Sequence, residues 1–272
     1  MKISVLSLFR DSERIIYDTL ARLESLEKNT NAEFEYFFYE NDSTDKTVEI
    51  LSNWIQDKEG EVISQKLNAP KFGSVDSHVR VQLMAHYRNT LLDSAKPLNS
   101  DFTVVFDSDV VFEKDIINQY LPYFADDVAM LTPNITQNIK CKMCDCGRDS
   151  YYDSWALMDK SGNFCMTWSH NPFYNQQDRD NWDAGVPVQV YTAFGGFALI
   201  KSEYLNQVNW AVNKGTCEHW GLCHKLNKYG KILVIPNVLT SVYLSQSVVG
   251  GLNPDSVDNL IRSQKNRLTK GD

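Results

Sequence analysis

The sequence lacks any long hydrophobic run. None of its 272 residues belong to an apolar stretch of the roughly 18 to 20 residues that a membrane-spanning helix requires. The first apolar segment, Ile3–Phe9, has only the length of a strand and is followed at once by Arg10 and Asp11, a pattern too short and too polar for a signal peptide. We therefore expect no transmembrane segment and a cytoplasmic location.

An excess of positive charge is also missing. The chain has 27 Lys and Arg against 35 Asp and Glu, which gives a net charge of −8 at pH 7. Proteins that bind nucleic acid backbones need a basic surface, so we expect no nucleic-acid partner. A small phosphorylated ligand can still bind an acidic protein where a metal ion and a few arginines neutralise it locally.

Cysteine is sparse, with six in the chain. Four of them, Cys141, Cys144, Cys146 and Cys165, could form a zinc site. Free thiols in a reducing cell, or one disulfide, are the alternatives that this spacing leaves open. A glycosylation sequon at Asn41 lies in a turn that we expect to bind a ligand, where a glycan would block binding. This agrees with a cytoplasmic location.

Apolar and amphipathic segments alternate along the first half of the chain. The patterns predict strands over residues 2–9, 33–39, 62–65, 103–112 and 128–132, and helices over 13–27, 46–56, 75–95 and 114–124. Asp11 or Ser12 is expected to cap the first helix. Strands that alternate with helices predict an α/β fold with a mostly parallel sheet and helices on both faces.

The composition changes after about residue 135. Residues 140–190 are rich in Cys, Tyr, Trp, Asn and Asp with little periodicity, so we expect an irregular, loop-rich region. Order returns in strands over 188–192, 197–201 and 232–238 and in a helix over 218–229. We expect a single domain over 1–272, with a nucleotide-binding half at 1–135, an acceptor and catalytic half at 136–250 and a tail at 251–272.

The most informative segment is the apolar run that contains Asp107, Ser108 and Asp109. Side chains alternate along a strand, so the two carboxylates are expected to face the same way where the strand ends. Two close carboxylates are good ligands for Mg²⁺ or Mn²⁺. The segment therefore predicts a divalent cation that is held against a phosphorylated substrate.

Other charged residues are expected near the same edge of the sheet. Ligands of parallel α/β sheets bind beyond the carboxyl ends of the strands. Glu40 or Asp42 could hold a base or ribose hydroxyl there, and Arg10 could stack on the nucleotide, although an ordinary capped turn is the alternative. Arg80 and Arg88 lie close to one face of the predicted helix and could bind phosphate or ribose oxygens, or form a solvated or salt-bridged face.

Together these segments resemble the GT-A class of nucleotide-sugar-dependent glycosyltransferases. The matching parts are Ile3 to Phe9, Glu40 to Thr47, Arg88-Asn89, Asp107-Ser108-Asp109, Phe194-Gly195-Gly196-Phe197 and Cys217-Glu218-His219-Trp220. Within that class, the chain is most similar to the fungal capsule-associated and Golgi mannosyltransferase groups, which share motifs like Tyr152-Asp153-Ser154-Trp155. The resemblance covers about residues 2–240. It implies transfer of a sugar from a UDP- or GDP-sugar to a hydroxyl of a glycan or other acceptor, with Mn²⁺ or Mg²⁺ as cofactor.

The resemblance also implies a role for each matching residue. Asp107 would touch the ribose or the metal, and Asp109 would hold the metal that bridges the two phosphates of the donor. Gly195-Gly196 would let the backbone approach the donor sugar or acceptor closely, or form a plain hairpin turn. Glu218 lies where inverting members carry the general base, although a retaining enzyme would use it for positioning, and a carboxylate at a helix start can also simply cap the helix or pair with its dipole. Asp153 would contact the acceptor, or be an ordinary loop carboxylate.

The sequence departs from the GT-A pattern at the third metal ligand. Many GT-A enzymes use a histidine after the last core strand, but residues 238–243 contain none. His219, His224 or water is left to complete the metal shell, and a packed or surface histidine is the alternative.

Aromatic residues between 151 and 182 are a further candidate for sugar contacts. Trp155, Trp168, Tyr174 and Trp182 could stack on sugar rings or simply pack an irregular segment.

Two other functions fit part of the sequence. The segment around Asp107 also resembles the nucleophile motif of haloacid-dehalogenase-like phosphatases. That motif belongs on the first strand of its domain, whereas about 100 residues of α/β pattern precede it here. A catalytically inactive sugar-binding module of the GT-A fold is the other alternative, and slow release of nucleoside diphosphate from a donor would distinguish it from an enzyme.

Overall fold

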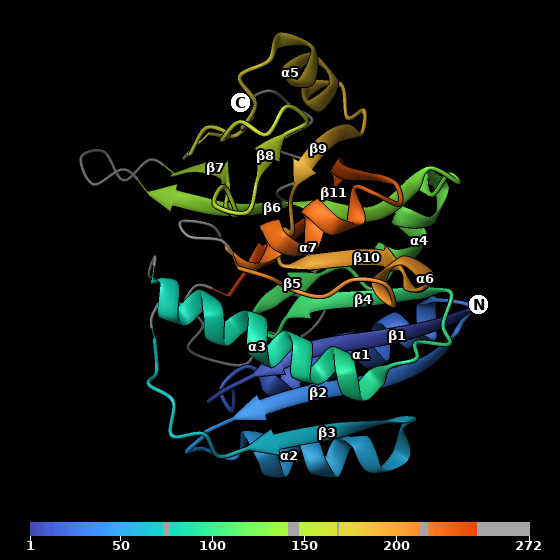
Figure 1. Cartoon of the computed structure of the whole chain (residues 1–272), viewed down its shortest axis with the longest axis vertical. Helices are drawn as coiled ribbons and strands as arrows, with labels where there is room; N and C mark the ends of the chain where they lie inside the picture. The colour runs from blue at the N-terminus through green and yellow to red at the C-terminus, as the bar shows by residue number, and fades with distance from the viewer. Residues whose placement is uncertain (73–76, 141–146, 168, 213–216, 244–272) are drawn as a thin grey trace.

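A computed structural model describes residues 1–72, 77–140, 147–167, 169–212 and 217–243 of the chain (Figure 1). The expected tail at 251–272, three of the four clustered cysteines (Cys141, Cys144 and Cys146) and Trp168 lie outside the described residues.

Strands and helices alternate through the first half of the chain, as the sequence predicts. The strands are β1 (Lys2–Phe9), β2 (Glu33–Asn41), β3 (Gly60–Gln65), β4 (Phe102–Asp107), β5 (Val110–Phe112), β6 (Val128–Lys140), β7 (Gly147–Tyr151), β8 (Met158–Asp159), β9 (Val188–Thr192), β10 (Phe197–Lys201) and β11 (Lys231–Val242). The helices are α1 (Ile16–Asn29), α2 (Thr47–Trp54), α3 (His78–Ala95), α4 (Ile116–Tyr120), α5 (Gln176–Asp183), α6 (Ser202–Leu205) and α7 (Glu218–Leu226), with short 3₁₀ turns at Ile55–Asp57 and Leu121–Tyr123.

One continuous sheet joins strands from both halves. Across the described residues its order is β3-β2-β1-β4-β10-β6-β11-β9-β8, with β5 paired to β11 and β7 paired to β6. The first four strands in this order run parallel, whereas β10 is antiparallel to both of its neighbours and β11 is parallel to β6. The α/β fold is therefore confirmed, with antiparallel pairs concentrated in the second half.

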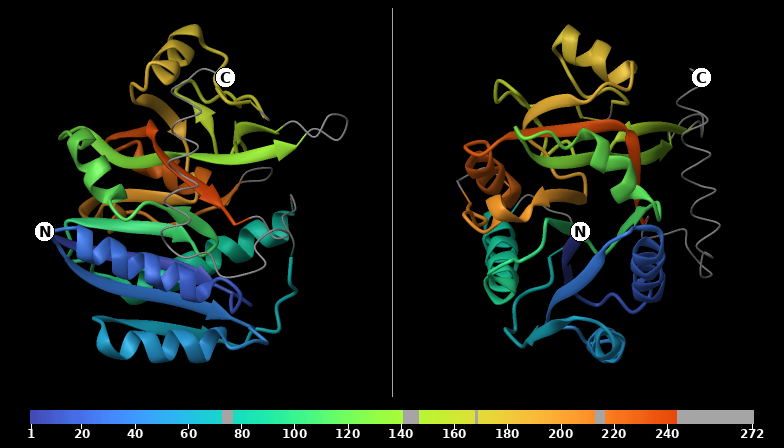
Figure 2. Two further views of the ribbon diagram at one scale, coloured as in Figure 1. Left: turned by 180° about the vertical axis from the view of Figure 1, so that it is seen from behind. Right: turned by 90° about the vertical axis from the view of Figure 1, so that its right-hand side faces the viewer.

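Helices cover both faces of the sheet. Helices α3, α6 and α7 lie on one face, and α1, α2 and α4 lie on the other (Figures 1 and 2). Central strands are buried on both sides, as Ile3 of β1 and Phe106 of β4 show, and α1 turns Leu20 and Leu23 toward the sheet. Burial of these apolar side chains drives the packing of the layers.

None of the described helices is both long and apolar enough to cross a membrane.

The strand register brings several functional segments to one edge of the sheet. Phe9 of β1 pairs with Glu40 of β2, and Leu8 of β1 pairs with Asp107 of β4. The residues that follow β1 and β2 and the end of β4 therefore lie together at the carboxyl edge of the parallel strands.

The predicted strand over residues 103–112 is wrong in one respect. It divides at Asp107-Ser108-Asp109 into β4 and β5, and β5 leaves β4 to pair with β11. The turn is fixed from two sides, because the Thr19 hydroxyl donates to the Ser108 carbonyl (2.9 Å) and the Tyr243 amide donates to the Asp109 carbonyl (2.8 Å). The two carboxylates therefore flank a turn and do not share one strand face.

The region 140–190 is more ordered than predicted. It contains β7, β8 and α5, and α5 escapes detection because it is a polar helix that buries only Asp178 and Trp182. The predicted cap of the first helix is also wrong. Helix α1 begins at Ile16 without a side-chain cap. Asp11 instead accepts a hydrogen bond from the Thr44 amide, and the Ser12 amide donates to the hydroxyl of Thr47 at the start of α2.

Candidate functional site

A cavity of about 750 Å³ opens at the carboxyl edge of the parallel strands. Most of the residues predicted for the site line it, namely Arg10, Arg80, Arg88, Asp107, Asp109, Asp153, Gly196, Glu218 and His219. They come from the ends of β1 and β4, from α3, from the start of α7 and from the segments that precede β5, β8 and β10. The cavity is large enough for a drug-sized ligand. Glu40, Asp42 and Gly195 are not among the lining residues.

Asp107 and Asp109 present oxygen atoms to this cavity. The side chain of Asp107 is 38% exposed, and one of its oxygens, Oδ1, accepts a hydrogen bond of 2.7 Å from Arg88. Asp109 is open to the cavity. Desolvation by the surrounding walls, followed by the negative charge of Asp107, raises the pKa of Asp109 to about 6, whereas the positive charge of Arg80 acts to lower it. A cation between the two aspartates would relieve this repulsion.

Arg88 is the buried centre of the charged network. Its side chain is 3% exposed, and besides Asp107 it contacts Glu218 through Nε at 3.4 Å and lies over the Phe194 ring, 5.2 Å from its centroid. Burial alone would lower the pKa of Arg88, but the two carboxylates outweigh it and raise the pKa. One guanidinium thus neutralises two acids from different parts of the chain.

His219 is used for packing, which argues against its predicted role as a metal ligand. Its ring stacks on Phe194 with centroids 3.7 Å apart, and Nε2 lies 3.5 Å from Glu218. Burial, then the charges of Arg88 and Arg80, lower its pKa well below the usual value, so the ring is neutral. Within the described ranges, no three His, Cys, Asp or Glu side chains gather to hold a metal ion. The alternative ligand His224 is exposed on α7, where its Nδ1 meets the Tyr191 hydroxyl.

Asp153 is attached to the Gly195-Gly196 turn. Its Oδ2 accepts a hydrogen bond of 3.0 Å from the Gly195 amide, and desolvation raises its pKa to about 7 with smaller contributions from Asp107 and Glu218. Both glycines have positive φ values, 62° and 65°, which side chains strongly disfavour. A Cβ on Gly196 would lie 2.4 Å from Val110, so the turn requires glycine for space as well as for conformation.

The carboxylates of Glu40 and Asp42 are engaged by the protein itself. Glu40 is buried and accepts hydrogen bonds from the Ser43 amide (2.6 Å) and the Ser64 hydroxyl (2.7 Å). Asp42 accepts from three consecutive backbone amides at residues 67–69, at 2.8 to 3.0 Å. These two residues therefore shape the loops beside the cavity.

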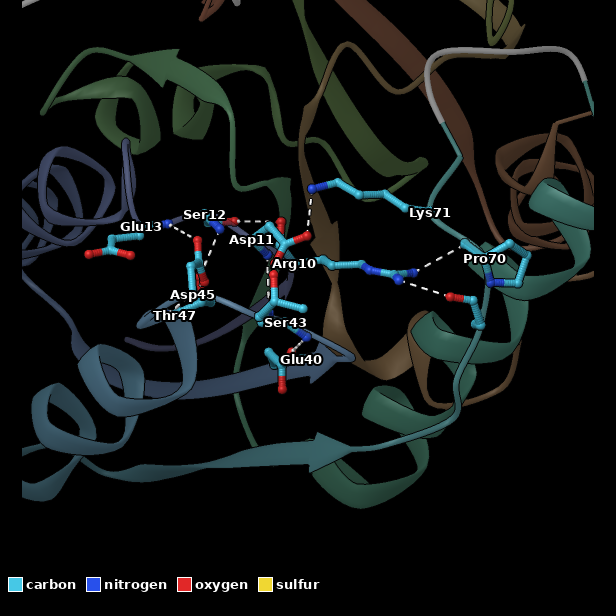
Figure 3. Close-up of polar contacts among 12 residues, drawn as sticks. Arg10, Asp11, Ser12, Glu13, Glu40, Ser43, Asp45, Thr47, Pro70 and Lys71 are labelled. Carbon is cyan, nitrogen blue, oxygen red and sulfur yellow. Dashed lines mark hydrogen bonds and ion pairs between the residues drawn. The ribbon is translucent and has the colours of Figure 1, made fainter.

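The loop held by Asp42 also carries contacts to Arg10 and Asp11. Arg10 donates to the carbonyls of Ala69 (2.9 Å) and Pro70 (3.2 Å), and Lys71 pairs with Asp11 (Figure 3). Lys71 and Asp11 line the cavity, although the sequence did not identify them as site residues. Their pairing spans 60 positions and leaves no local pattern that could have revealed it.

Replacement of Asp42 by Asn is expected to remove part of the acid sensitivity of the fold. Desolvation would raise the pKa of Asp42, but hydrogen bonds from Asn41 and from the amides of 67–69 outweigh it and lower the pKa to about 2. The lowered pKa stabilises the folded state above the unfolded pKa near 4, and this stabilisation is lost as the pH falls toward 2. Thermal unfolding measured between pH 2 and pH 6 should therefore show that acid lowers the Tm of Asp42→Asn less than it lowers the Tm of the wild type.

Asn tolerates the positive φ of residue 42, so this substitution tests the charge and not the backbone. Asp93→Asn, at an exposed position of α3, is the control and should keep the acid-induced fall of the wild type. Equal acid sensitivity in the Asp42 and Asp93 variants would contradict the prediction.

The cysteine and the aromatic residues that the sequence offered as further candidates differ in burial and in distance from the cavity. Cys165 is buried, and desolvation raises the pKa of its thiol to about 12. Trp155 lines the cavity, whereas Trp182 packs in the core against Tyr151. Tyr174 is 69% exposed and is not a lining residue.

Comparisons with known proteins agree with this architecture. The model of the family described as cryptococcal mannosyltransferase 1 matches residues 7–226. No curated protein matches the sequence significantly.

Similar solved structures share the fold at low sequence identity. S. aureus TarS 1–349 has a TM-score of 0.53 and 16% identity over 89% of this chain and 60% of its own. The same protein in complex with UDP has a TM-score of 0.54 and 15% identity over 98% of this chain and 71% of its own. Mannosyltransferase PcManGT from Pyrobaculum calidifontis, in complex with GDP-Man and Mn²⁺, has a TM-score of 0.52 and 14% identity over 98% of this chain and 69% of its own. This structural similarity confirms the predicted GT-A fold. The chain spans about three fifths of the length of the first TarS structure.

Proposed function

Because the chain belongs to the cryptococcal mannosyltransferase 1 family of glycosyltransferases, we propose that it transfers a sugar from a nucleoside-diphosphate sugar to a hydroxyl group of a glycan acceptor with the help of a divalent metal ion. In this proposal residues 1–272 form one GT-A domain, in which 1–135 bind the nucleotide and 136–250 bind the acceptor. A UDP- or GDP-sugar is the donor.

The observation that carries this proposal is the composition of the cavity. Cations and carboxylates line one space at the edge of the sheet, and both kinds of charge are needed to bind a diphosphate through a metal. PcManGT, which has the same fold, is described in complex with GDP-Man and Mn²⁺, so GDP-mannose with Mn²⁺ is the first donor to test.

The carboxylates of Asp107 and Asp109 fit a hard divalent cation. Arg88 occupies only one oxygen of Asp107, Asp109 opens to the cavity, and their mutual repulsion favours a positive charge between them. When bound, Mn²⁺ or Mg²⁺ would act as a Lewis acid for the departing diphosphate. Water or donor oxygens would complete its shell, because the His219 ring is stacked on Phe194.

Positive side chains would position the donor. Arg80 lies in the cavity close enough to influence Asp109 electrostatically and is the proposed phosphate contact. Two N–H groups of Arg10 already bind loop carbonyls, which fixes the plane of the guanidinium for stacking on the base. Glu40 and Asp42 would support this arrangement through the loops and would not touch the nucleotide.

Two other carboxylates that line the cavity would handle the acceptor. Glu218, at the start of α7, is held by Arg88, and we assign it the task of accepting the proton of the acceptor hydroxyl or, in a retaining reaction, of positioning the reactants. Asp153, which lines the cavity and is oriented by the Gly195 amide, would accept a hydrogen bond from an acceptor hydroxyl. Gly196 would allow the sugar to approach the backbone.

The pH dependence of sugar transfer should follow the ionisation of Asp153. Its pKa of about 7 means that the side chain loses its proton as the pH rises through neutrality. If the carboxylate contacts the acceptor, kcat/KM for the acceptor should rise roughly tenfold per pH unit below 7 and level off above it. Asp153→Asn should abolish this rise, whereas Asp180→Asn, at an exposed position of α5 outside the cavity lining, should retain it. If kcat/KM rises with pH below 7 in Asp153→Asn as it does in the wild type, Asp153 does not contact the acceptor as proposed.

The function is tested by incubating the full chain with GDP-mannose, UDP-glucose or UDP-N-acetylglucosamine, with and without Mn²⁺. Release of nucleoside diphosphate that depends on the metal supports the proposal. Stabilisation of the fold by a donor without any such release would instead identify an inactive binding module. No release and no stabilisation with any donor would contradict both.

A further inference from the structure

Three aromatic residues lie in series between the cavity and the surface, joined by one hydrogen bond to the backbone and one contact between rings. Trp155 lines the cavity, and its carbonyl accepts a hydrogen bond of 3.0 Å from the indole Nε1 of Trp220. The Trp220 ring in turn contacts Phe164, with centroids 5.1 Å apart and planes inclined by 51°. We call Trp155, Trp220 and Phe164 the aromatic strip.

The strip leads to the proposed reaction centre. Trp220, the middle residue of the strip, lies two positions after Glu218 in the first turn of α7, so the strip is attached to the same helix as the carboxylate proposed to act on the acceptor. Tyr152, which is 39% exposed, lines the cavity beside Trp155. A chain that follows the strip inward would therefore arrive on the acceptor side, near Glu218 and Asp153.

Phe164 is held in an exposed position by its own turn. Its side chain is 57% exposed, although burial of an aromatic ring normally stabilises a fold. The turn is bonded across its base, where Met158 bridges to Phe164, and the Asp159 carboxylate accepts from the amides of Ser161 and Asn163, each at 2.9 Å. The ring is thus presented by an ordered backbone, which reduces the entropy cost of binding.

We propose that the aromatic strip binds the pyranose rings of a glycan acceptor beyond the sugar that reacts. This inference rests on the proposed function and specifies its acceptor as an oligosaccharide of at least two sugars. The apolar C–H faces of pyranoses stack on aromatic rings, while their hydroxyls require polar groups at the edges. Exposed Lys160, Ser161 and Asn163 surround Phe164 and supply such groups.

A carbohydrate fits the strip better than a protein partner does. The exposed apolar area consists of a few rings in a row with polar neighbours, whereas a stable protein interface needs about 800 Å² on each side. One member of the strip, Trp155, also lines the cavity, which a separate protein-binding surface would not require.

The test compares Phe164→Ala with Tyr174→Ala in the full chain. Tyr174 is an equally exposed aromatic outside the cavity lining, so it controls for the loss of a surface ring. With GDP-mannose and Mn²⁺, mannobiose, cellobiose and lactose are the acceptors. We expect Phe164→Ala to raise the acceptor KM about tenfold for the preferred disaccharide, which corresponds to the loss of one stacking contact. The donor KM should change less than twofold, Tyr174→Ala should match the wild type, and Phe164→Trp should restore the acceptor KM.

Binding measured directly separates this inference from the proposed function. Saturation-transfer NMR with the same three disaccharides should show contact with the wild type and its loss in Phe164→Ala. If the disaccharides contact the wild type and not Phe164→Ala, but no donor is turned over, the result supports the sugar subsite and contradicts the proposed catalysis. If the wild type transfers sugar but both variants have equal acceptor KM and equal binding, the aromatic strip is not the acceptor subsite.

Discussion

Replacement of Glu218 by Gln is expected to lower turnover by about 100- to 10 000-fold, the range associated with removal of a positioned general base. Gln has nearly the shape of Glu and can still accept a hydrogen bond from Arg88, so the cavity should keep its form. It cannot take a proton from an acceptor hydroxyl. The affinity for the donor, measured by calorimetry with GDP and Mn²⁺, should change less than about twofold, because other residues, Arg10 and Arg80, are the proposed donor contacts.

The matched control for this variant is Glu203→Gln. Glu203 is also an acidic residue in the first turn of a helix, α6, but it is exposed and does not line the cavity. It should retain full activity, which would exclude a general effect of acidic charge at a helix start. Loss of donor binding in Glu218→Gln, in parallel with loss of turnover, would show that Glu218 supports the structure of the site and does not act on the acceptor.

Replacement of Asp109 by Asn is expected to lower kcat/KM by about 100- to 1000-fold and to weaken the response to Mn²⁺, because a metal that stabilises the leaving diphosphate contributes several kcal/mol. The raised pKa of Asp109 gives a second readout. Its ionised form is disfavoured in the fold, so without metal the Asn variant should be at least as stable as the wild type above pH 6. The wild type should gain Tm on addition of Mn²⁺, and the variant should gain little.

Asp126→Asn is the control for the metal prediction. Asp126 adjoins a second carboxylate, Asp127, but both are exposed and lie outside the cavity lining. This variant should respond to Mn²⁺ like the wild type, and chelation by EDTA should abolish the wild-type activity. An Asp109→Asn enzyme that keeps its activity and its stabilisation by Mn²⁺ would rule out Asp109 as a ligand.

The segments that carry the fold were predicted from short-range patterns. Strand β1 and helix α1 follow from apolar residues at spacings of two and of three to four, which depend only on backbone geometry. The parallel first half then places Arg10 and Asp107 at one edge of the sheet without any knowledge of side-chain packing. Helix α5 was missed because its burial is confined to two residues and leaves no periodic signal.

The covalent chain by itself determined that Asp107 and Asp109 are neighbours and that an α/β sheet brings them to a ligand-binding edge. The tertiary structure decided which partners these acids have. Arg88 meets Glu218 across 130 positions, and Asp42, expected to face a ligand, turns instead to three loop amides. His219 packs on Phe194, with its Nε2 beside Glu218. The reason is physical: spacing along the chain is local, whereas a buried charge or ring is stabilised by whichever partner the packed fold places beside it.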